Sequence, residues 1–283
     1  MSVKPYTKAI IAFSGKCGKI IDMDKQKQIA LVAENDEDRV LFARIYDRLT
    51  SAEQKNIPGV TCFLSPREQV LTKKMLPHME LHFFGGSSNA ERAMACWLPD
   101  YLDESWLTDE DSPAAAVRAT YFEKDELTHR DFLGSLMGCG IKRETVGDIY
   151  VGKGTCDFLV TKEILPYVLD NLISAGRTKL HVEQISLEEL AVPQLTVKEY
   201  RDTVSSLRLD AIVGSGFHMA RGKASALIET GKVSLNDLPC MKPDKLLAEG
   251  DKVSCRGFGK LILAQVGGRT KKDRISIVIE QYQ

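Results

Sequence analysis

Apolar residues recur at three- and four-residue steps over residues 23–56, which predicts a helix interrupted at residues 35–38. A second helix is predicted to begin at Ser65-Pro66-Arg67-Glu68, because Ser is a good N-cap, Pro suits the first helical position and Glu completes a capping box. A proline ends this helix near residue 75. Residues 1–75 are therefore predicted to be an N-terminal extension followed by helices.

Shorter apolar segments replace the helical pattern in the middle of the chain. Strands are predicted at residues 80–84, 92–98, 115–122, 148–151, 156–160 and 179–185. Helices fit residues 129–137 and 162–173. Strands that alternate with helices are typical of an α/β sandwich, in which helices cover one face of a sheet. Residues 76–190 are therefore predicted to form a central α/β domain.

The last third of the chain, residues 201–283, combines two short helices with small strands. The first apolar stripe contains Leu207, Leu209, Ile212 and Val213, and the second contains Ala220, Ala224, Leu227 and Ile228. Gly231 is suited to close the second helix as a left-handed cap. Strands are expected at residues 232–235 and 252–255. This order predicts a small ααβββ domain, and the chain as a whole is predicted to be α+β.

Charge is distributed unevenly along the chain. The totals nearly cancel, with 38 Lys plus Arg against 39 Asp plus Glu. Residues 201–283, however, hold 14 basic and 9 acidic residues, a net of +5, which leaves −6 for residues 1–200. This asymmetry favours a C-terminal domain that binds a polyanion. No apolar stretch approaches eighteen residues, so no membrane span is expected.

The chain offers little to suggest catalysis. Its seven cysteines are at least fifteen residues apart, so no zinc-ligand spacing is present, and we expect a reducing, cytoplasmic location. The sequence Gly257-Phe258-Gly259 lacks the third glycine of a phosphate loop and is interpreted as a hairpin turn. No nucleophile with a base can be assembled. We therefore predict a protein that is not an enzyme, with no cofactor, metal or small-molecule substrate.

Basic residues of the last third are candidates for binding RNA. Arg208, Arg221 and Lys223 are expected opposite the apolar stripes, on a two-helix platform that can straddle a phosphate backbone. The predicted RNA-binding residues are Arg208, Arg221, Lys223, Lys232, Arg256, Lys260, Arg269, Lys271 and Lys272. The last three are expected at a hairpin tip. Because Arg208 and Arg221 are expected on the surface, reversing their charge is predicted to leave stability almost unchanged.

Residues 205–262 resemble the RNA-binding domain named after the fourth small-subunit ribosomal protein, here called the S-four domain. The matching residues are Arg208-Leu209-Asp210, Arg221, Lys223, Gly231-Lys232-Val233, Asn236 and Gly250-Asp251-Lys252-Val253. Two positions depart from the pattern: Ala220 replaces the usual Ser before Arg221, and Asp237 replaces the usual Gly of an Asn-Gly turn. Neither departure removes a basic residue.

The resemblance extends over roughly residues 60–283 to the YlmH family of bacteria. It is carried by Ser65-Pro66-Arg67-Glu68, Phe83-Phe84-Gly85-Gly86, Ala90-Glu91-Arg92, His129-Arg130-Asp131, Gly140-Ile141-Lys142-Arg143, Gly147-Asp148-Ile149 and Thr270-Lys271-Lys272-Asp273. The resemblance implies a central RNA-binding-like domain before the S-four domain. It also implies binding to rRNA and tRNA on large ribosomal subunits that carry stalled peptidyl-tRNA, in quality control, and a gene-neighbourhood link to cell division.

Two other functions remain open from the sequence. Some pseudouridine synthases use an S-four module as an anchor, but their catalytic signature places Gly before Arg-Leu-Asp and Thr or Ser three residues after the Asp. Here Leu207 and Val213 occupy those positions. A protein-interaction adaptor for the division machinery is the other alternative, and it is compatible with RNA binding.

Overall fold

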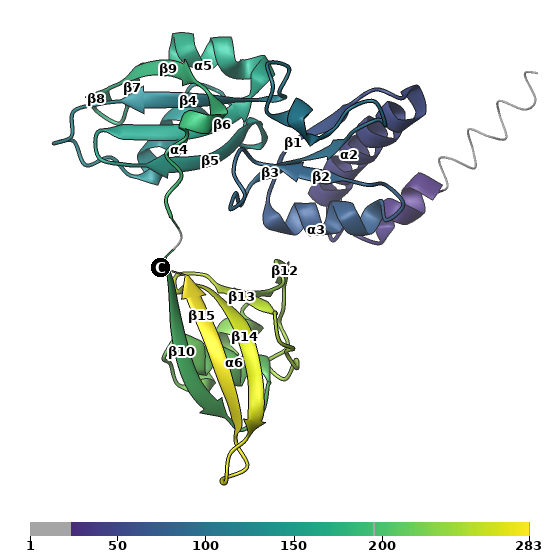
Figure 1. The fold of residues 1–283 in the computed structure, drawn as a ribbon, viewed down its shortest axis with the longest axis vertical. Coiled ribbons are helices and arrows are strands. Elements are labelled where there is room, and N and C mark those ends of the chain that lie inside the picture. Colours follow the sequence, from purple (N-terminus) through teal and green to yellow (C-terminus); the bar gives the residue numbers. More distant parts are fainter. Residues whose placement is uncertain (1–23, 195, 283) are drawn as a thin grey trace, which may run out of the picture. The chain divides into compact units, whose positions relative to one another are not determined.

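The computed structural model describes residues 24–194 and 196–282 and divides the chain into two compact units (Figure 1). The first unit holds the described residues up to Val192, and the second begins at Pro193. None of the helices in the described part of the chain is long and apolar enough to cross a membrane.

The first unit begins with two helical segments. Residues 24–30 are helical, and helix α2 (Asp36–Lys55) follows after a break. Asn35 is the N-cap of α2, since its side-chain oxygen accepts a hydrogen bond from the backbone N of Asp38 at 2.8 Å. The helix is interrupted as predicted, but at residues 31–35, because residues 36–38 already belong to α2. The buried side of α2, which includes Phe42 and Leu49, packs on strand β1 (Gly59–Leu64).

Strand β1 belongs to a three-stranded antiparallel sheet in the order β1-β3-β2, with β2 (His82–Phe84) and β3 (Ala93–Trp97). Helix α3 (Pro66–Met75) begins with the predicted capping box: the Ser65 backbone N donates to Glu68 at 2.6 Å, and the Glu68 backbone N donates to the Ser65 hydroxyl at 3.4 Å. Because β1 precedes residue 75 and pairs with β3 after it, the sheet spans the boundary predicted at residues 75–76.

A second sheet in the first unit is antiparallel throughout, in the order β5-β6-β4-β9. Its strands are β4 (Ala114–Thr120), β5 (Val146–Val151), β6 (Thr155–Thr161) and β9 (His181–Ile185). Helices α4 (His129–Gly138) and α5 (Leu165–Asn171) share one core with Val117 and Phe158. On the other face, Leu159 packs with Phe63 and Met94 of the first sheet. Smaller elements are η1 (Glu104–Leu107), η2 (Arg143–Thr145), η3 (Lys162–Ile164), η4 (Leu187–Glu189), β7 (Ser174–Ala175) and β8 (Thr178–Lys179).

The α+β class is confirmed, but the predicted central strands do not all join one sheet. The strands predicted at residues 80–84 and 92–98 correspond to β2 and β3, which pair with each other and with β1 instead of extending the sandwich. The sequence analysis did not identify β1, and without it β2 and β3 have no separate sheet to join.

The second unit is a six-stranded antiparallel sheet, in the order β10-β15-β14-β13-β11-β12, with two helices (Figure 1). Its elements are β10 (Val197–Val204), α6 (Leu209–Gly216), α7 (Arg221–Glu229), β11 (Val233–Leu235), β12 (Leu238–Pro239), β13 (Lys252–Cys255), β14 (Gly259–Arg269) and β15 (Ile275–Tyr282). Ile212 and Ile228 of the helices share a core with Leu261 and Ile279 of the sheet.

The ααβββ arrangement is present within a larger sheet. Strand β10 was not predicted, and it pairs with β15 along its whole length, from Val197 opposite Tyr282 to Val204 opposite Ile275. The second unit therefore includes residues before 201. Gly231 has a φ of 68°, and its backbone N donates to the Ile228 oxygen at 3.0 Å, so it closes α7 in the left-handed conformation as predicted.

Replacing Gly85 by Ala is expected to lower the free energy of unfolding by about 1–3 kcal/mol, because the new methyl group overpacks a tight connection. A Cβ at Gly85 lies 2.4 Å from the Ala90 Cβ and 2.5 Å from the Arg92 carbonyl oxygen, and neither atom can rotate away. Urea denaturation measures the effect. The control is Gly134→Ala in α4, where no atom lies within 4 Å and a gain of up to about 1 kcal/mol is expected. Equal stability of the two variants would contradict this interpretation of Gly85.

Candidate nucleic-acid interface

The predicted RNA-binding residues occupy three places on the second unit. Lys223, Lys232 and Arg256 lie around the β13–β14 turn, Arg208 and Arg221 surround Asp210, and Arg269, Lys271 and Lys272 lie at the β14–β15 turn. Lys260 lies near the start of β14, opposite Ser254. Strand β14 has 11 residues, and a strand rises about 3.3 Å per residue, so its two ends are roughly 35 Å apart. The structure therefore does not bring all of these residues into one site.

Lys223, Lys232 and Arg256 form a group that we call the turn cluster. The Lys223 Nζ lies 5.1 Å from the centre of the Phe258 ring, and the Arg256 backbone N donates to the Lys232 oxygen at 2.9 Å. All three side chains are exposed, and within residues 24–194 and 196–282 none of them pairs with a carboxylate. Unneutralised cations beside an exposed aromatic ring are typical of nucleic-acid-binding surfaces.

The conformation of the β13–β14 turn explains the position of Phe258. Gly257 and Gly259 have φ angles of 84° and 99°, and the Phe258 backbone N donates to the Cys255 oxygen at 2.9 Å. The hairpin-turn interpretation of Gly257-Phe258-Gly259 is therefore confirmed. Phe217 supports the exposed ring, with 6.1 Å between the ring centres. The sequence analysis missed Phe258 as a site residue, although an aromatic residue between two glycines beside Arg256 was a usable signal.

Asp210 holds Arg208 and Arg221 together. Its side chain is 4% exposed, and it accepts hydrogen bonds from Arg208 Nε at 3.2 Å, Arg208 Nη2 at 2.9 Å and Arg221 Nη2 at 3.1 Å. Burial raises the pKa of the Asp210 carboxyl, but the hydrogen bonds and charges of the two arginines outweigh it, so the pKa lies below its usual range. Asp210 has a structural role, because it fixes two cations.

The position of Arg208 corrects the sequence analysis. Arg208 was predicted on the outer face of a helix, but α6 begins only at Leu209, and Arg208 is its extended N-cap with φ of −70° and ψ of 147°. Its guanidinium turns back to Asp210 and is 37% exposed, while that of Arg221 is 50% exposed. Reversing both charges is therefore now expected to lower stability instead of leaving it almost unchanged, because Asp210 would be buried without its two cations.

The segment after β12 completes the start of α6. The Leu209 backbone N donates to the Lys245 oxygen at 2.8 Å, and the Asp210 backbone N donates to the Pro243 oxygen at 3.0 Å. The first N–H groups of a helix have no partner within the helix, so these carbonyl groups satisfy them. These hydrogen bonds fix the backbone next to Arg208, the N-cap residue that precedes α6.

The unusual Asn236-Asp237 turn is stabilised by ion pairing and hydrogen bonding. Both residues have positive φ, 51° and 66°, as a two-residue hairpin turn requires. Asn236 donates to Asp251 at 2.8 Å and accepts from the Lys252 backbone N at 2.9 Å, while Lys252 Nζ lies 2.6 Å from Asp237. An aspartate therefore replaces the glycine of this turn and has an ion-pair partner.

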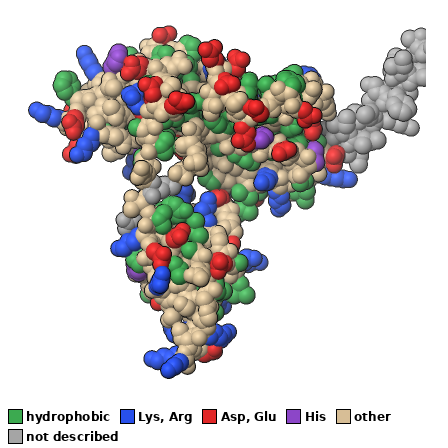
Figure 2. Space-filling view, viewed as in Figure 1, with side chains coloured by type: hydrophobic (Ala, Val, Ile, Leu, Met, Phe, Trp, Pro, Cys, Tyr) green, Lys and Arg blue, Asp and Glu red, His purple; other side chains and the backbone are tan. Residues whose placement is uncertain are grey.

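The β14–β15 turn forms a basic hairpin tip, and Figure 2 shows Lys and Arg side chains at this free end of the second unit. Lys271 and Lys272 are exposed and have no ion pair within the described residues. Arg269 pairs with Asp273 at 2.6 Å, and Arg274 binds Thr203 through its hydroxyl (2.9 Å) and its carbonyl oxygen. Lys271, Lys272 and Arg274 therefore carry the net positive charge of the tip, because Thr203 is neutral.

A hollow of about 300 Å³ lies between the end of β10 and the loop from α6 to α7. Arg221 and Arg274 both line it, together with Thr203 and Ser215. It connects the Asp210 cluster to the base of the hairpin tip. Basic side chains therefore continue from the helices toward β15 on this part of the unit.

The described residues show no grouped metal ligands, and the buried Cys96 thiol is poorly reactive. No group of three or more His, Cys, Asp or Glu residues in the described ranges is placed to hold a metal ion. The described cysteines are all free, and burial raises the pKa of the Cys96 thiol to about 12. A thiol with so high a pKa stays protonated and is a weak nucleophile at neutral pH.

Comparisons with known proteins identify relatives of both parts of the chain. Residues 110–189 match the family described as "Putative RNA-binding domain in YlmH", and they include the sheet β5-β6-β4-β9. The chain is 36% identical over 225 residues to the "Ribosome-associated protein quality control protein P2" of Bacillus subtilis (strain 168). This match covers 78% of this chain and 86% of that protein. The solved structure of the "Cell division protein ylmH from Streptococcus pneumoniae" is 24% identical, with a TM-score of 0.46, covering 56% of this chain and 96% of that one.

Proposed function

The chain belongs to the YlmH family, and on that premise we propose that it binds RNA in ribosome-associated quality control. The second unit is proposed to be an S-four-type domain that contacts structured RNA. The first unit contributes the segment that matches a family RNA-binding domain. The proposal requires no catalytic step and no cofactor.

The turn cluster is the observation that carries this proposal. Three exposed cations without carboxylate partners in the described chain lie around the β13–β14 turn that holds Phe258. Binding a phosphate to such a cation releases counterions from the RNA, and this release supplies most of the affinity. Since the ring of Phe258 is 37% exposed, it also offers a surface for a base or a ribose.

The second part of the proposal concerns which RNA the protein binds. We propose that the target is rRNA and tRNA on a large ribosomal subunit that retains a stalled peptidyl-tRNA, which places the protein in the cytoplasm. The printed name of the Bacillus relative supports the ribosomal association. Two RNA-binding units on one chain raise the affinity for a target that offers both sites, because binding of the first unit raises the effective concentration of the second.

Full-length protein mixed with purified ribosomal subunits is expected to sediment with large subunits, and more strongly with those that retain tRNA. If roughly three to five phosphates are contacted, raising the salt concentration from about 50 to 200 mM weakens binding by one to three orders of magnitude. Sucrose-gradient sedimentation at several salt concentrations measures both effects. Small subunits are the control. Equal binding to small subunits, or binding that is independent of salt, would contradict the proposal.

A further inference from the structure

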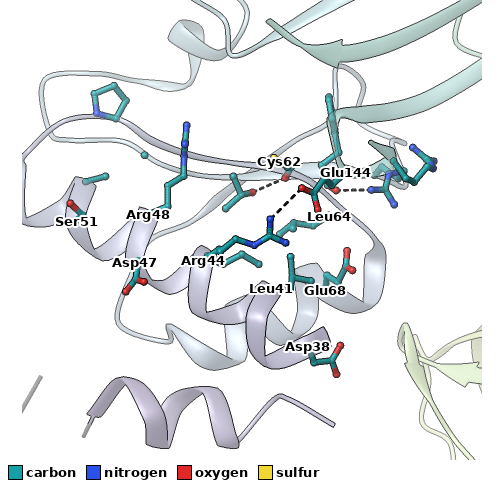
Figure 3. Close-up of a pocket in the computed structure, with 18 of the residues that line it drawn as sticks. Asp38, Leu41, Arg44, Asp47, Arg48, Ser51, Cys62, Leu64, Glu68 and Glu144 are labelled. Atoms are coloured by element: carbon teal, nitrogen blue, oxygen red, sulfur yellow. Dashed lines mark hydrogen bonds and ion pairs between the residues drawn. The ribbon is translucent and has the colours of Figure 1, made fainter. Parts of the chain in front are cut away.

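A groove of about 1010 Å³ lies between α2 and β1 in the first unit (Figure 3). Helix α2 supplies Arg44 and Arg48 to one wall, and β1 supplies Cys62 to the other. Arg92 and Arg143 also line the groove. It is distinct from the turn cluster, which belongs to the second unit.

Five acidic side chains line this groove; Glu37 is exposed, and the other four have partners. Asp38 pairs with Arg67, Asp47 with Lys25 and Glu144 with Arg44, at 2.8, 2.8 and 3.3 Å, and Glu68 accepts the Ser65 backbone N of its capping box. Figure 3 shows Arg44 reaching across to Glu144. Most of the negative charge of the lining is therefore committed to other groups.

Three arginines of the groove bind main-chain oxygens instead of carboxylates. Arg48 donates to the Val60 oxygen, Arg92 to the oxygens of Phe63 (2.6 Å) and Val146 (3.1 Å), and Arg143 to those of Val146 (2.5 Å) and Gly147 (3.2 Å). Within the described residues, no carboxylate lies at ion-pair distance from these three guanidinium groups. A carbonyl oxygen orients a guanidinium group without neutralising its charge.

The charges of Arg92 and Arg143 are close enough to affect each other. Burial, and then the neighbouring charge of Arg92, lower the pKa of Arg143 to about 10. The nearby Asp148 carboxylate accepts the backbone N–H groups of Glu91 and Arg92, at 2.6 and 3.1 Å. The carboxylates of Glu68 and Asp148 compensate these charges through space without forming an ion pair, so a bound anion would stabilise the two half-buried cations further.

An exposed aromatic residue contacts the chain next to a segment that lines the groove. Tyr101 is 60% exposed, and its hydroxyl donates to the Asn56 oxygen at 3.0 Å. The next residues along the chain, Ile57 and Pro58, line the groove, and Ile57 is 47% exposed. Arginines without an ion pair next to an exposed aromatic ring are features of sites for single-stranded nucleic acids, because the phosphates follow the cations and an unpaired base stacks.

We propose that this groove binds a single-stranded RNA segment, with phosphates at Arg48, Arg92 and Arg143 and a base against Tyr101. The inference rests on the proposed function and adds a contact in the first unit. Paired bases in a duplex have no free face for Tyr101, so the groove selects unpaired RNA. The contacts are to phosphate and to a ring face, so little sequence preference is expected.

Alkylation of Cys62 in the full-length protein reports directly on occupancy. Cys62 lines the groove and is partly exposed, and Cys139 is a matched control that is also partly exposed, just after α4. A saturating twelve-nucleotide oligouridylate is expected to slow alkylation of Cys62 roughly fivefold or more and to leave Cys139 nearly unchanged. An unchanged rate at Cys62 would overturn the proposal.

A variant tests the energetic contribution of the same groove. Arg48→Glu with Tyr101→Ala is expected to weaken oligouridylate binding by about tenfold and to make the salt dependence shallower. The control is Arg39→Glu with Tyr167→Ala: Arg39 is also exposed on α2, and the Tyr167 hydroxyl likewise donates to a backbone oxygen, that of Cys139 at 2.8 Å. Arg92 and Arg143 stay intact because they join β1 to β5.

The outcomes separate this inference from the proposed function. A structured RNA hairpin is expected to bind wild type and the groove variant equally, because the turn cluster lies in the other unit. If the hairpin binds but the groove variant retains full affinity for oligouridylate, only the groove proposal fails. If wild type binds neither RNA, the proposed function fails as well.

Discussion

Reversing the charges of the turn cluster, with Lys223→Glu, Lys232→Glu and Arg256→Glu together, is expected to lower the affinity for structured RNA by at least one hundredfold. At about 150 mM salt, each lost phosphate contact costs roughly four- to sixfold in affinity, so three contacts account for about this factor before repulsion is added. All three side chains are exposed, so the melting temperature should change by only a few degrees. Fluorescence anisotropy with a labelled RNA hairpin measures the affinity.

A matched variant separates local contact from overall charge. Lys73→Glu, Lys74→Glu and Lys124→Glu change the net charge equally, at exposed positions of the first unit. Because these lysines belong to the first unit and are not part of the turn cluster, this variant should bind within roughly threefold of wild type. Equal losses in the two variants would mean that only the net charge matters and that the turn cluster is not a binding site.

The double change Arg208→Gln with Arg221→Gln is expected to lower the melting temperature of the second unit by roughly 10 °C at pH 7, because it leaves Asp210 as a buried carboxylate without its cations. In the wild type the pKa of Asp210 is lowered, so its contribution to stability is present above the ordinary pKa and is lost as the pH falls through the lowered value. Calorimetry between about pH 3 and 7 measures the difference.

The sign of the pH dependence reverses in the double variant. Burial alone then acts on Asp210 and raises its pKa, so the carboxylate destabilises the fold above that pKa and the penalty disappears as the pH falls. The deficit relative to wild type should therefore shrink on acidification. Adding Asp210→Asn to the double variant removes the charge and should restore part of the stability at pH 7. A pH-independent deficit would show that the loss comes from packing.

Elements with a local stop or start signal could be predicted from the sequence. The capping box at Ser65 and the left-handed Gly231 depend on neighbouring residues only, and both are present in the structure. Strand β10 was missed because it is an edge strand whose positions 197–202 leave charged side chains in solvent, so its pattern resembles that of a linker. Strand β1 was missed because its six residues form a short apolar run next to a strong helix start.

The sequence predicted which basic residues form the candidate site, but it did not predict how their side chains are arranged. The basic residues could be identified because charge is visible in the sequence. The pairing of Arg208 and Arg221 with Asp210 depends on where α6 begins, and that start is fixed by the carbonyl groups of Pro243 and Lys245, which lie far along the chain beyond α7 and β12. Local periodicity carries no information about such contacts, so the helix was predicted to begin too early.

The position of β15 has a consequence for biosynthesis. It is the last strand in chain order, yet it lies between β10 and β14, and its Ile277 and Ile279 are almost completely buried in the core. During translation, β10 therefore has no neighbouring strand until β15 is synthesised, roughly seventy residues later. The sheet of the second unit cannot close before β15 has been synthesised, so β10, α6 and α7 reach their final packing only when this last strand of the unit is in place.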